Sequence, residues 1–212
     1  MTTIDIVSDL VCPWCYIGLR RLDAAIAEVR RERPDFSCEK RWLPFFLNPD
    51  TPPEGEPYLP FLEKKFGGPA PVLALFERVR AAGRPWGVDY AFEKIEVRAN
   101  TLQAHRLIHW AQQRGDAARL VERLFVAQFQ RGERIGDVAL LAQVAVECGY
   151  PGAEVERYLA SGADIEEVRT SERCFRAMGI SMVPTFIVDG RQVVVGAEDP
   201  AVLAAAINKT LA

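Results

Sequence analysis

The sequence predicts an α/β fold in which the two ends of the chain form one domain and a helical segment is inserted between them. Residues 4–43 have the order strand, helix, strand, and residues 185–195 have the pattern of a β-hairpin. Apolar residues recur at helical spacing over roughly a hundred residues in between. We therefore expect residues 1–47 and 180–212 to form a discontinuous domain, with residues 48–179 as an irregular connection and helical insertion.

The N-terminal segment predicts a strand, a long helix and a second strand. Residues 4–7 are mostly β-branched, and helical spacing runs from Pro13 to a stop at Pro34. The apolar positions of this helix are Leu19, Leu22, Ala25, Ile26 and Val29. Residues 36–43 then alternate well enough to form a second strand with one apolar face.

The middle of the chain predicts an ordered connection followed by several helices. Residues 44–71 hold eight of the 14 prolines, which favours an irregular but ordered path. Capping residues and apolar spacing predict further helices, including one that continues from residue 120 to residue 128. Their expected starts are Pro71, Asn100, Asp137 and Asp164, and the glycines that end three of them are Gly83, Gly149 and Gly179.

The C-terminal segment returns to strands. Residues 185–188 and 192–195 are apolar, β-prone runs on either side of Asp189 and Gly190. Since Asp-Gly suits a two-residue type I′ turn, we expect a hairpin here. Asp199 and Pro200 then predict the start of a final helix.

Composition excludes several classes of function. The chain has 212 residues, 49% of them hydrophobic, and a formal net charge of −3. This balance argues against binding to nucleic acid or to a membrane surface. No apolar run approaches the roughly 18 residues that cross a bilayer. The first residues lack the basic and apolar regions of a secretory signal, so we expect a cytoplasmic protein.

Cys12 and Cys15 form a Cys-Pro-Trp-Cys motif at the predicted strand-to-helix junction. A helix N-terminus stabilises negative charge, so this position favours the thiolate of Cys12, which is the attacking species in disulfide exchange. Cys15, one turn further and more buried, can resolve the mixed disulfide. Pro13 suits the first helical turn, where its missing N–H has no cost.

Metal binding and inert thiols are the alternatives for this pair. A zinc site needs four close ligands, and the sequence shows no second cysteine pair. His105 and His109 are spaced i, i+4, but they border an apolar stripe, so we expect packing or substrate contact and no metal. The cysteines at 38, 148 and 174 are expected to be structural, although a second redox pair among them stays open.

Val183 and Pro184 form a second feature. Pro184 opens an otherwise β-branched strand, which makes the Val183–Pro184 bond a candidate for the cis isomer. An edge-strand proline or a simple proline at a strand start is the alternative.

Four segments together give the whole chain a resemblance to the FrnE-like subgroup of DsbA-family thioredoxin-like oxidoreductases. They are residues 8–18 (SDLVCPWCYIG), 46–50 (FLNPD), 100–106 (NTLQAHR) and 183–186 (VPTF). The resemblance implies a thioredoxin-like fold with a mixed central sheet and a helical insertion, and a cis Val183–Pro184 bond beside the cysteines. It also implies that Cys12 attacks and Cys15 resolves, and that Pro13, Trp14, Val183 and Pro184 contact the substrate.

One departure from that family bears on whether the protein oxidises or reduces its substrates. Periplasmic DsbA proteins commonly carry a histidine where this chain has Trp14. Without that cation the Cys12 thiolate is less stabilised, so the pair should be less oxidising. We therefore expect a reductase or isomerase of protein or peptide disulfides, working with a cellular thiol reductant and without a cofactor, more than a net oxidase.

The runner-up is a glutathione-dependent small-molecule enzyme. The same superfamily contains 2-hydroxychromene-2-carboxylate isomerases and kappa-class glutathione transferases, which hold glutathione where this chain has Cys12 and which resemble it around residues 100–106. A redox-sensing or chaperone-like binding module is the third reading. Asp9, Asn100 and His105 are candidate substrate-pocket residues. Asp9 is also a candidate proton acceptor near the cysteines, with capping of the turn as the alternative.

Overall fold

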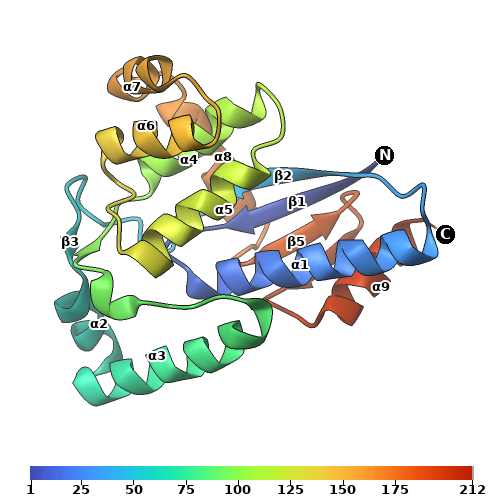
Figure 1. The fold of residues 1–212 in the computed structure, drawn as a ribbon, viewed down its shortest axis with the longest axis horizontal. Coiled ribbons are helices and arrows are strands. Elements are labelled where there is room, and N and C mark those ends of the chain that lie inside the picture. Colours follow the sequence, from blue (N-terminus) through green and yellow to red (C-terminus); the bar gives the residue numbers. More distant parts are fainter. Residues whose placement is uncertain (212) are drawn as a thin grey trace.

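The computed structural model describes residues 1–211 and contains a four-stranded mixed sheet in the order β2-β1-β5-β6 (Figure 1). Strand β1 (Thr2–Ser8) runs parallel to β2 (Cys38–Pro44) and antiparallel to β5 (Thr185–Val188). Strand β6 (Gln192–Val195) completes the hairpin at the edge. The predicted α/β class with a mixed sheet is confirmed. Residue 212, the last of the predicted C-terminal range, lies outside the described residues.

Helices α1 (Pro13–Glu32) and α9 (Pro200–Thr210) pack against each other and against one face of this sheet. The apolar stripe predicted for α1 is buried from Leu19 to Val29. Its helix ends at Glu32 because Pro34 follows. In α9 the Asp199 carboxylate accepts the Ala201 N–H at 2.9 Å, as expected for a helix start.

The other elements lie between β2 and β5 along the chain, and they form the helical part seen on the left of Figure 1. In chain order they are β3 (Glu56–Pro57), α2 (Tyr58–Phe66), α3 (Pro69–Gly83), η1 (Arg84–Trp86), η2 (Phe92–Lys94), β4 (Val97–Arg98), α4 (Leu102–Gln112), α5 (Ala118–Val126), η3 (Ala127–Arg131), α6 (Val138–Glu147), α7 (Gly152–Ala160) and α8 (Ile165–Ala177). Within the described residues, no helix is both long and apolar enough to cross a bilayer.

Several expected boundaries were wrong. Helix α3 begins at Pro69, not Pro71, and α2 and α7 were not predicted at all. Pro57, which the sequence analysis placed in the irregular connection, and Pro151, which it did not use, both stand at the N-cap, where proline is tolerated because the N–H has no helical partner. The expected capping box is also absent, since Asn100 caps Leu102 N–H while Gln103 binds Arg106.

The predicted hairpin is present with one extra residue. Asp189 and Gly190 both have positive φ, 48° and 64°, as a type I′ turn requires. The register pairs Val188 with Gln192, however, so Arg191 also belongs to the loop. The turn chemistry was therefore predicted correctly, and the two-residue loop length was not.

Arg106 organises the helical insertion. Its side chain is fully buried, and its guanidinium donates hydrogen bonds of 2.9–3.0 Å to carbonyl oxygens in the last turn of α7 and just after it. These acceptors are Tyr158, Leu159, Ser161 and Ala163. The last carbonyls of a helix lack internal partners, and a cation there also interacts favourably with the helix dipole. Arg106 thus joins α4, which carries His105, to α7.

Candidate active site

Cys12 and Cys15 lie at the N-terminus of α1, where β1 ends. Cys12 is the N-cap residue, with φ −94° and ψ 111°, and Pro13 is the first helical residue. The Cys12 N–H donates to the Asp9 carbonyl at 3.1 Å, and the Cys15 N–H donates to the Cys12 carbonyl at 3.0 Å. This turn brings the two thiols onto the same end of the helix. The strand-to-helix placement expected from the sequence is confirmed.

Both cysteines are free thiols, and solvent reaches little of either. Cys12 is 5% exposed and Cys15 is 2% exposed, so Cys15 is the more buried of the two, as expected, but only by a small margin. Burial raises the pKa of Cys15 well above its ordinary value, and the hydrogen bond and charge of Cys12 raise it further. Cys15 is therefore a protonated thiol at neutral pH, and it must lose a proton before it can attack a disulfide.

Val183 and Pro184 lie directly beside the pair. The peptide bond between them is cis, as predicted, and the Cys12 thiol donates to the Val183 carbonyl with Sγ and O 3.8 Å apart. Gly18, two turns into α1, is buried where this loop crosses the helix. A Cβ atom at Gly18 would lie 2.7 Å from Cγ of Pro184, so the absence of a side chain permits this approach.

Asp9 and His105 form a buried polar pair next to the motif. Asp9 is 1% exposed; its Oδ2 accepts the Leu47 N–H at 2.7 Å, and its Oδ1 lies 3.4 Å from Nε2 of His105. The ring of His105 also contacts Phe46 edge-to-face, with ring centres 5.5 Å apart. The sequence analysis named His105 as a candidate substrate-pocket residue. In the structure its side chain is buried against Asp9 and Phe46.

The other proposed pocket residue, Asn100, borders a cavity of about 260 Å³ together with Phe46 and Arg173. Its side-chain amide donates to the Thr51 carbonyl at 2.7 Å, and its Oδ1 accepts the Leu102 N–H at 3.0 Å. Asn100 therefore ties the proline-rich connection to the start of α4. Both ends of its side chain are already engaged within the protein.

Tyr90 and Arg78 also reach the motif, and sequence analysis missed both. The Tyr90 hydroxyl donates to the Pro13 carbonyl at 2.6 Å, and burial raises the pKa of Tyr90 so that it stays a neutral donor. The Arg78 guanidinium lies over the Trp14 ring, 5.7 Å from its centre. Neither residue has a local sequence signal, because each meets the motif only through the packing of the insertion.

The two histidines face different surroundings. His109 Nε2 lies 4.0 Å from Asp164 Oδ2 and 3.7 Å from Glu167 Oε1, whereas His105 contacts Asp9. The i, i+4 spacing of the histidines therefore does not bring them to one shared ligand site. His109 is held in addition by Gln113, at 2.8 Å from its Nε2.

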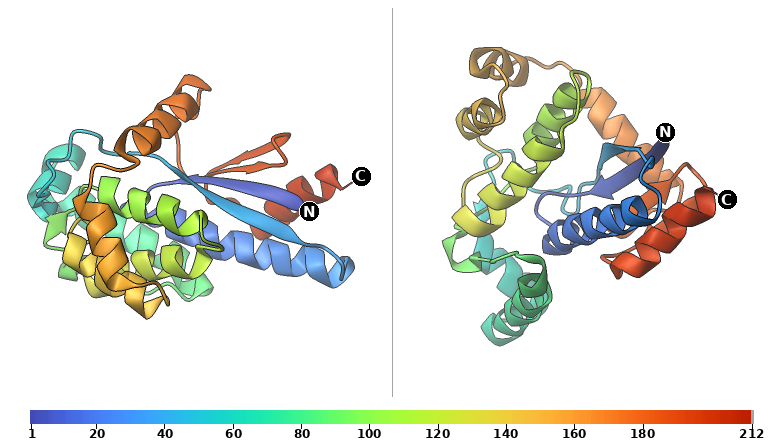
Figure 2. Two further views of the ribbon diagram at one scale, coloured as in Figure 1. Left: turned by 90° about the horizontal axis from the view of Figure 1, so that it is seen from above. Right: turned by 45° about the vertical axis from the view of Figure 1, so that its right-hand side comes forward.

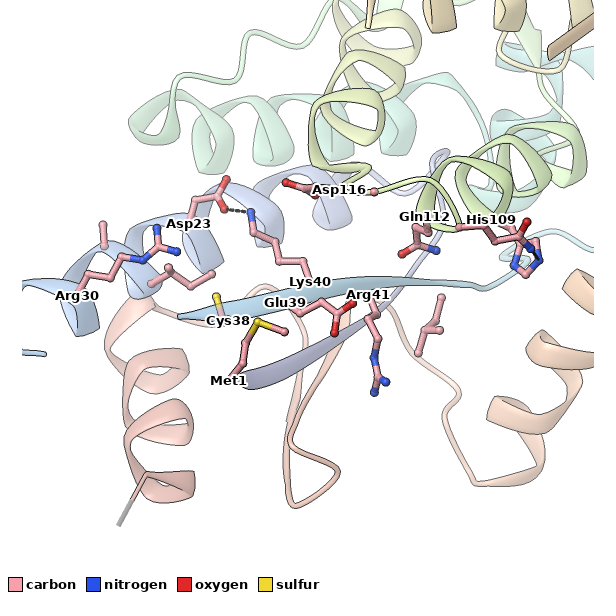
Figure 3. A pocket seen from close by; sticks show the side chains of 15 residues that line it. Met1, Asp23, Arg30, Cys38, Glu39, Lys40, Arg41, His109, Gln112 and Asp116 are labelled. Atoms are coloured by element: carbon pink, nitrogen blue, oxygen red, sulfur yellow. Dashed lines mark hydrogen bonds and ion pairs between the residues drawn. The ribbon is translucent and has the colours of Figure 1, made fainter. Parts of the chain in front are cut away.

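The remaining cysteines occupy three separate places. Cys38 is half-buried on β2 and lines a cavity of about 930 Å³ between β2, α1 and the end of α4 (Figure 3). There Lys40 pairs with Asp23 at 2.5 Å. Cys148 is half-buried at the end of α6, and Cys174 is exposed on α8. Partial burial raises the pKa of both Cys38 and Cys148, which is typical of unreactive thiols.

Comparison with known proteins identifies the family. The DSBA-like thioredoxin domain matches residues 3–208. The chain belongs to the DsbA-like thioredoxin family. This is a family of thiol oxidoreductases, and the predicted DsbA-type resemblance is thereby confirmed at the level of the family. In such a protein the Cys12–Cys15 pair occupies the helix N-terminus that the fold provides.

Individual relatives cover nearly the whole chain. The Bacillus subtilis (strain 168) protein YwbO is 27% identical over 206 residues, covering 97% of this chain and 95% of its own. The probable DsbA oxidoreductase SCO1869 of Streptomyces coelicolor has 28% identity and a TM-score of 0.89, covering 100% of this chain and 90% of that one.

Two more distant structures share the fold alone. A 2-hydroxychromene-2-carboxylate isomerase has a TM-score of 0.71 at 16% identity, covering 99% of this chain and 96% of its own. The cytosolic disulfide reductase DsbM of Pseudomonas aeruginosa, solved with GSH, has a TM-score of 0.66 at 20% identity, covering 99% and 98%. The same fold thus carries both of the chemistries considered from the sequence.

Proposed function

We propose that this protein exchanges disulfides with protein or peptide substrates through its Cys12-Pro13-Trp14-Cys15 dithiol. The observation that supports this most strongly is the arrangement of two free thiols. Cys12 caps α1 beside the Val183 carbonyl, and Cys15 is hydrogen-bonded to Cys12 behind it. A second thiol hydrogen-bonded to the first is in position to resolve a mixed disulfide.

The reaction proceeds in two exchanges. The Cys12 thiolate attacks one sulfur of a substrate disulfide, the S–S bond breaks, and the leaving sulfur takes up a proton. Cys15, deprotonated, then attacks the Cys12 sulfur of the mixed disulfide and releases the second substrate thiol. The substrate gains two electrons, and the enzyme is left with a Cys12–Cys15 disulfide. Two molecules of a cellular thiol such as glutathione then reduce this disulfide to the dithiol and are themselves joined in a disulfide.

Asp9 and His105 are proposed to accept the Cys15 proton. The Asp9 backbone is hydrogen-bonded to Cys15, and its carboxylate is close enough to raise the pKa of that thiol. Tyr90 also faces the pair but stays protonated. A buried carboxylate in contact with an imidazole offers a place for the proton without opening the site to water.

The direction proposed is reduction or isomerisation in the cytoplasm. Trp14 gives the motif no ionisable neighbour between its cysteines, so the Cys12 thiolate lacks the adjacent cation that makes such a pair more oxidising. The net charge of −3 favours neither nucleic acid nor a membrane surface as partner. The cytosolic disulfide reductase among the similar folds supports the same direction.

The test is trapping of the mixed disulfide. Cys15→Ser leaves the attacking thiol but removes the resolving one. It should therefore accumulate mixed disulfides between Cys12 and a disulfide-containing peptide. Cys12→Ser should trap nothing, and wild type should reduce insulin. Equal trapping by both variants contradicts the assignment. Glutathione-dependent isomerisation of a small molecule without insulin reduction would favour the runner-up instead.

A further inference from the structure

Three segments that lie far apart in the sequence surround a cavity of about 260 Å³, which we call the α4–α8 cavity. They come from residues 46–49 after β2, residues 100–102 at the start of α4, and residues 169–173 in α8. Helix α8 packs against both β2 and α4, and the left view of Figure 2 shows it beside the chain that leaves β2. The residues of the FLNPD and NTLQAHR motifs at this cavity have no part in the proposed disulfide exchange.

Two guanidinium groups lie in the α8 wall of the cavity. Arg169 and Arg173 are four residues apart, so they share one face of the helix and repel each other. Glu166 is 4.0 Å from Arg169 and 3.7 Å from Arg173, but its side chain is 75% exposed, so water screens both pairs. Arg173 also donates to Thr170 Oγ1 at 2.7 Å. Since a guanidinium has more N–H donors than these contacts use, both arginines can bind a further anion.

Glu172, the acidic residue of the cavity wall, is already neutralised. It is 6% exposed, and its Oε1 accepts hydrogen bonds from the Arg176 guanidinium and from the Phe46 N–H at 3.4 Å. Arg176 also donates to the Phe46 carbonyl at 2.5 Å, which holds this cation beside the carboxylate. The cavity wall therefore has a net positive charge from Arg169 and Arg173.

A buried hydroxyl opens on the cavity from the start of α4. Thr101 is 5% exposed and lines the cavity, yet its side chain does not cap the helix and makes no hydrogen bond with any of residues 1–211. Buried polar groups nearly always have a hydrogen-bond partner, so this hydroxyl is available to a ligand. The N-terminus of a helix also favours negative charge. Donors and positive charge thus face the cavity from both helices.

We propose that the α4–α8 cavity binds a small organic oxyanion, either a carboxylate or a phosphate ester. The planar guanidinium groups of Arg169 and Arg173 match the geometry of both kinds of anion, and Thr101 adds a neutral donor. The cavity is smaller than the roughly 300–1,000 Å³ of sites for drug-sized ligands, so the ligand is small. This site goes beyond the disulfide exchange proposed above and does not depend on it.

Isothermal titration calorimetry tests the site with inorganic phosphate and with succinate, each compared with sodium chloride at the same ionic strength. Wild type should bind one phosphate or one succinate per chain, and the tighter of the two identifies the class of anion. Arg173→Gln should weaken this binding about tenfold, because a charge-assisted contact is lost. Arg157→Gln is the matched control, since Arg157 is exposed on α7 and lies outside the cavity. It should keep the wild-type affinity.

Thr101 gives a second pair of variants. Thr101→Val keeps the branched shape but removes the hydroxyl, so the affinity should fall about fivefold. Thr101→Ser keeps the hydroxyl and should bind within about twofold of wild type. Thermal unfolding without added anion checks that these variants are folded. Added phosphate or succinate should raise the Tm of wild type and raise that of Arg173→Gln much less, because only the folded state binds the anion.

Two results overturn the proposal. One is an equal response of wild type to chloride, phosphate and succinate, and the other is an equal loss of affinity in Arg157→Gln and Arg173→Gln. Either result would show general screening of charge and no site. The titrations do not use the dithiol, so a failure of disulfide exchange would leave this site standing.

Discussion

At the residue scale, the identity of residue 14 is the clearest control over redox potential. Trp14 contributes an aromatic ring that Arg78 covers, but it places no charge between the cysteines. Trp14→His adds an ionisable group beside Cys12, which stabilises the thiolate and hence the reduced form. We expect the pair to become more oxidising, by about 30 mV for each 1.4 kcal/mol of stabilisation.

The measurement is the equilibrium of the Cys12–Cys15 pair with glutathione buffers. Trp14→Phe is the control, because it keeps an aromatic ring under Arg78 without adding a cation. The control should stay close to the wild-type potential. A Trp14→His protein that is equally reducing or more reducing contradicts this account of how the potential is set.

A second residue-scale prediction concerns proton transfer from Cys15. Since the pKa of Cys15 is raised, its thiolate fraction at neutral pH is small. Below that pKa, the fraction increases about tenfold for each unit by which the pH is raised. Asp9→Asn removes the proposed acceptor. Resolution of a preformed mixed disulfide should then slow at pH 7 by about 10²-fold.

The same variant should recover as the pH rises, because hydroxide increasingly does the work of the missing carboxylate. Wild type should show a flatter profile over the same range. Stopped-flow release of the substrate thiol measures both, and the rate of Cys12 alkylation checks that the first step is intact. Parallel pH profiles for the two proteins would contradict proton transfer to Asp9 and leave it only a structural role.

At the element scale, the contact between α1 and the Val183–Pro184 loop depends on Gly18. A Cβ atom there would meet Pro184 at 2.7 Å and Phe186 at 3.1 Å, so Gly18→Ala must displace the loop. Alanine improves helix propensity by about 1 kcal/mol, but overpacking costs about 1–3 kcal/mol. We expect slower reduction of peptide disulfides, with alkylation of Cys12 by a small reagent nearly unchanged.

Gly162→Ala is the matched control, because a Cβ atom at Gly162 meets no other atom within 4 Å. Peptide reduction by this variant should equal that of wild type. Comparable kinetics for the two alanine variants would show that the close approach of Pro184 to α1 has no influence on substrate.

At the scale of the whole molecule, the insertion holds together through buried polar contacts as well as through its core. Arg106→Met keeps the length of the side chain but leaves the carbonyls in the last turn of α7 and just after it without their donor. Each buried carbonyl that stays unsatisfied costs about 1–3 kcal/mol, so we expect a loss of about 3 kcal/mol or more. For a chain of this size that lowers Tm by roughly 6–12 °C.

Thermal unfolding followed by circular dichroism measures this effect. Arg31→Met is the control, because Arg31 is an exposed arginine in the last turn of α1. It should shift Tm by no more than about 1–2 °C, in line with surface substitutions. Similar Tm values for the two variants would show that water or a backbone shift replaces the guanidinium.

Local patterns in the sequence were sufficient for the α/β class and for the dithiol at a strand-to-helix junction, whereas the cis bond before Pro184 was predicted only with the help of the family resemblance. Each rests on neighbouring residues: apolar spacing sets helices and strands, and Cys12 lies next to the Pro13 that begins α1. The same reasoning failed for α2 and α7, since a proline at a helix start has the same local appearance as one that breaks a helix.

The surroundings of the dithiol were decided only by tertiary packing. His105 reaches Asp9 across 96 residues, Tyr90 reaches Pro13 across 77, and Val183 reaches Cys12 across 171. No pattern of period 2 or 3.6 encodes such contacts, because they depend on how separate elements pack. The sequence by itself determined that the two cysteines of the motif lie at the start of α1. The fold determined which groups face them, and hence how deeply Cys15 is buried.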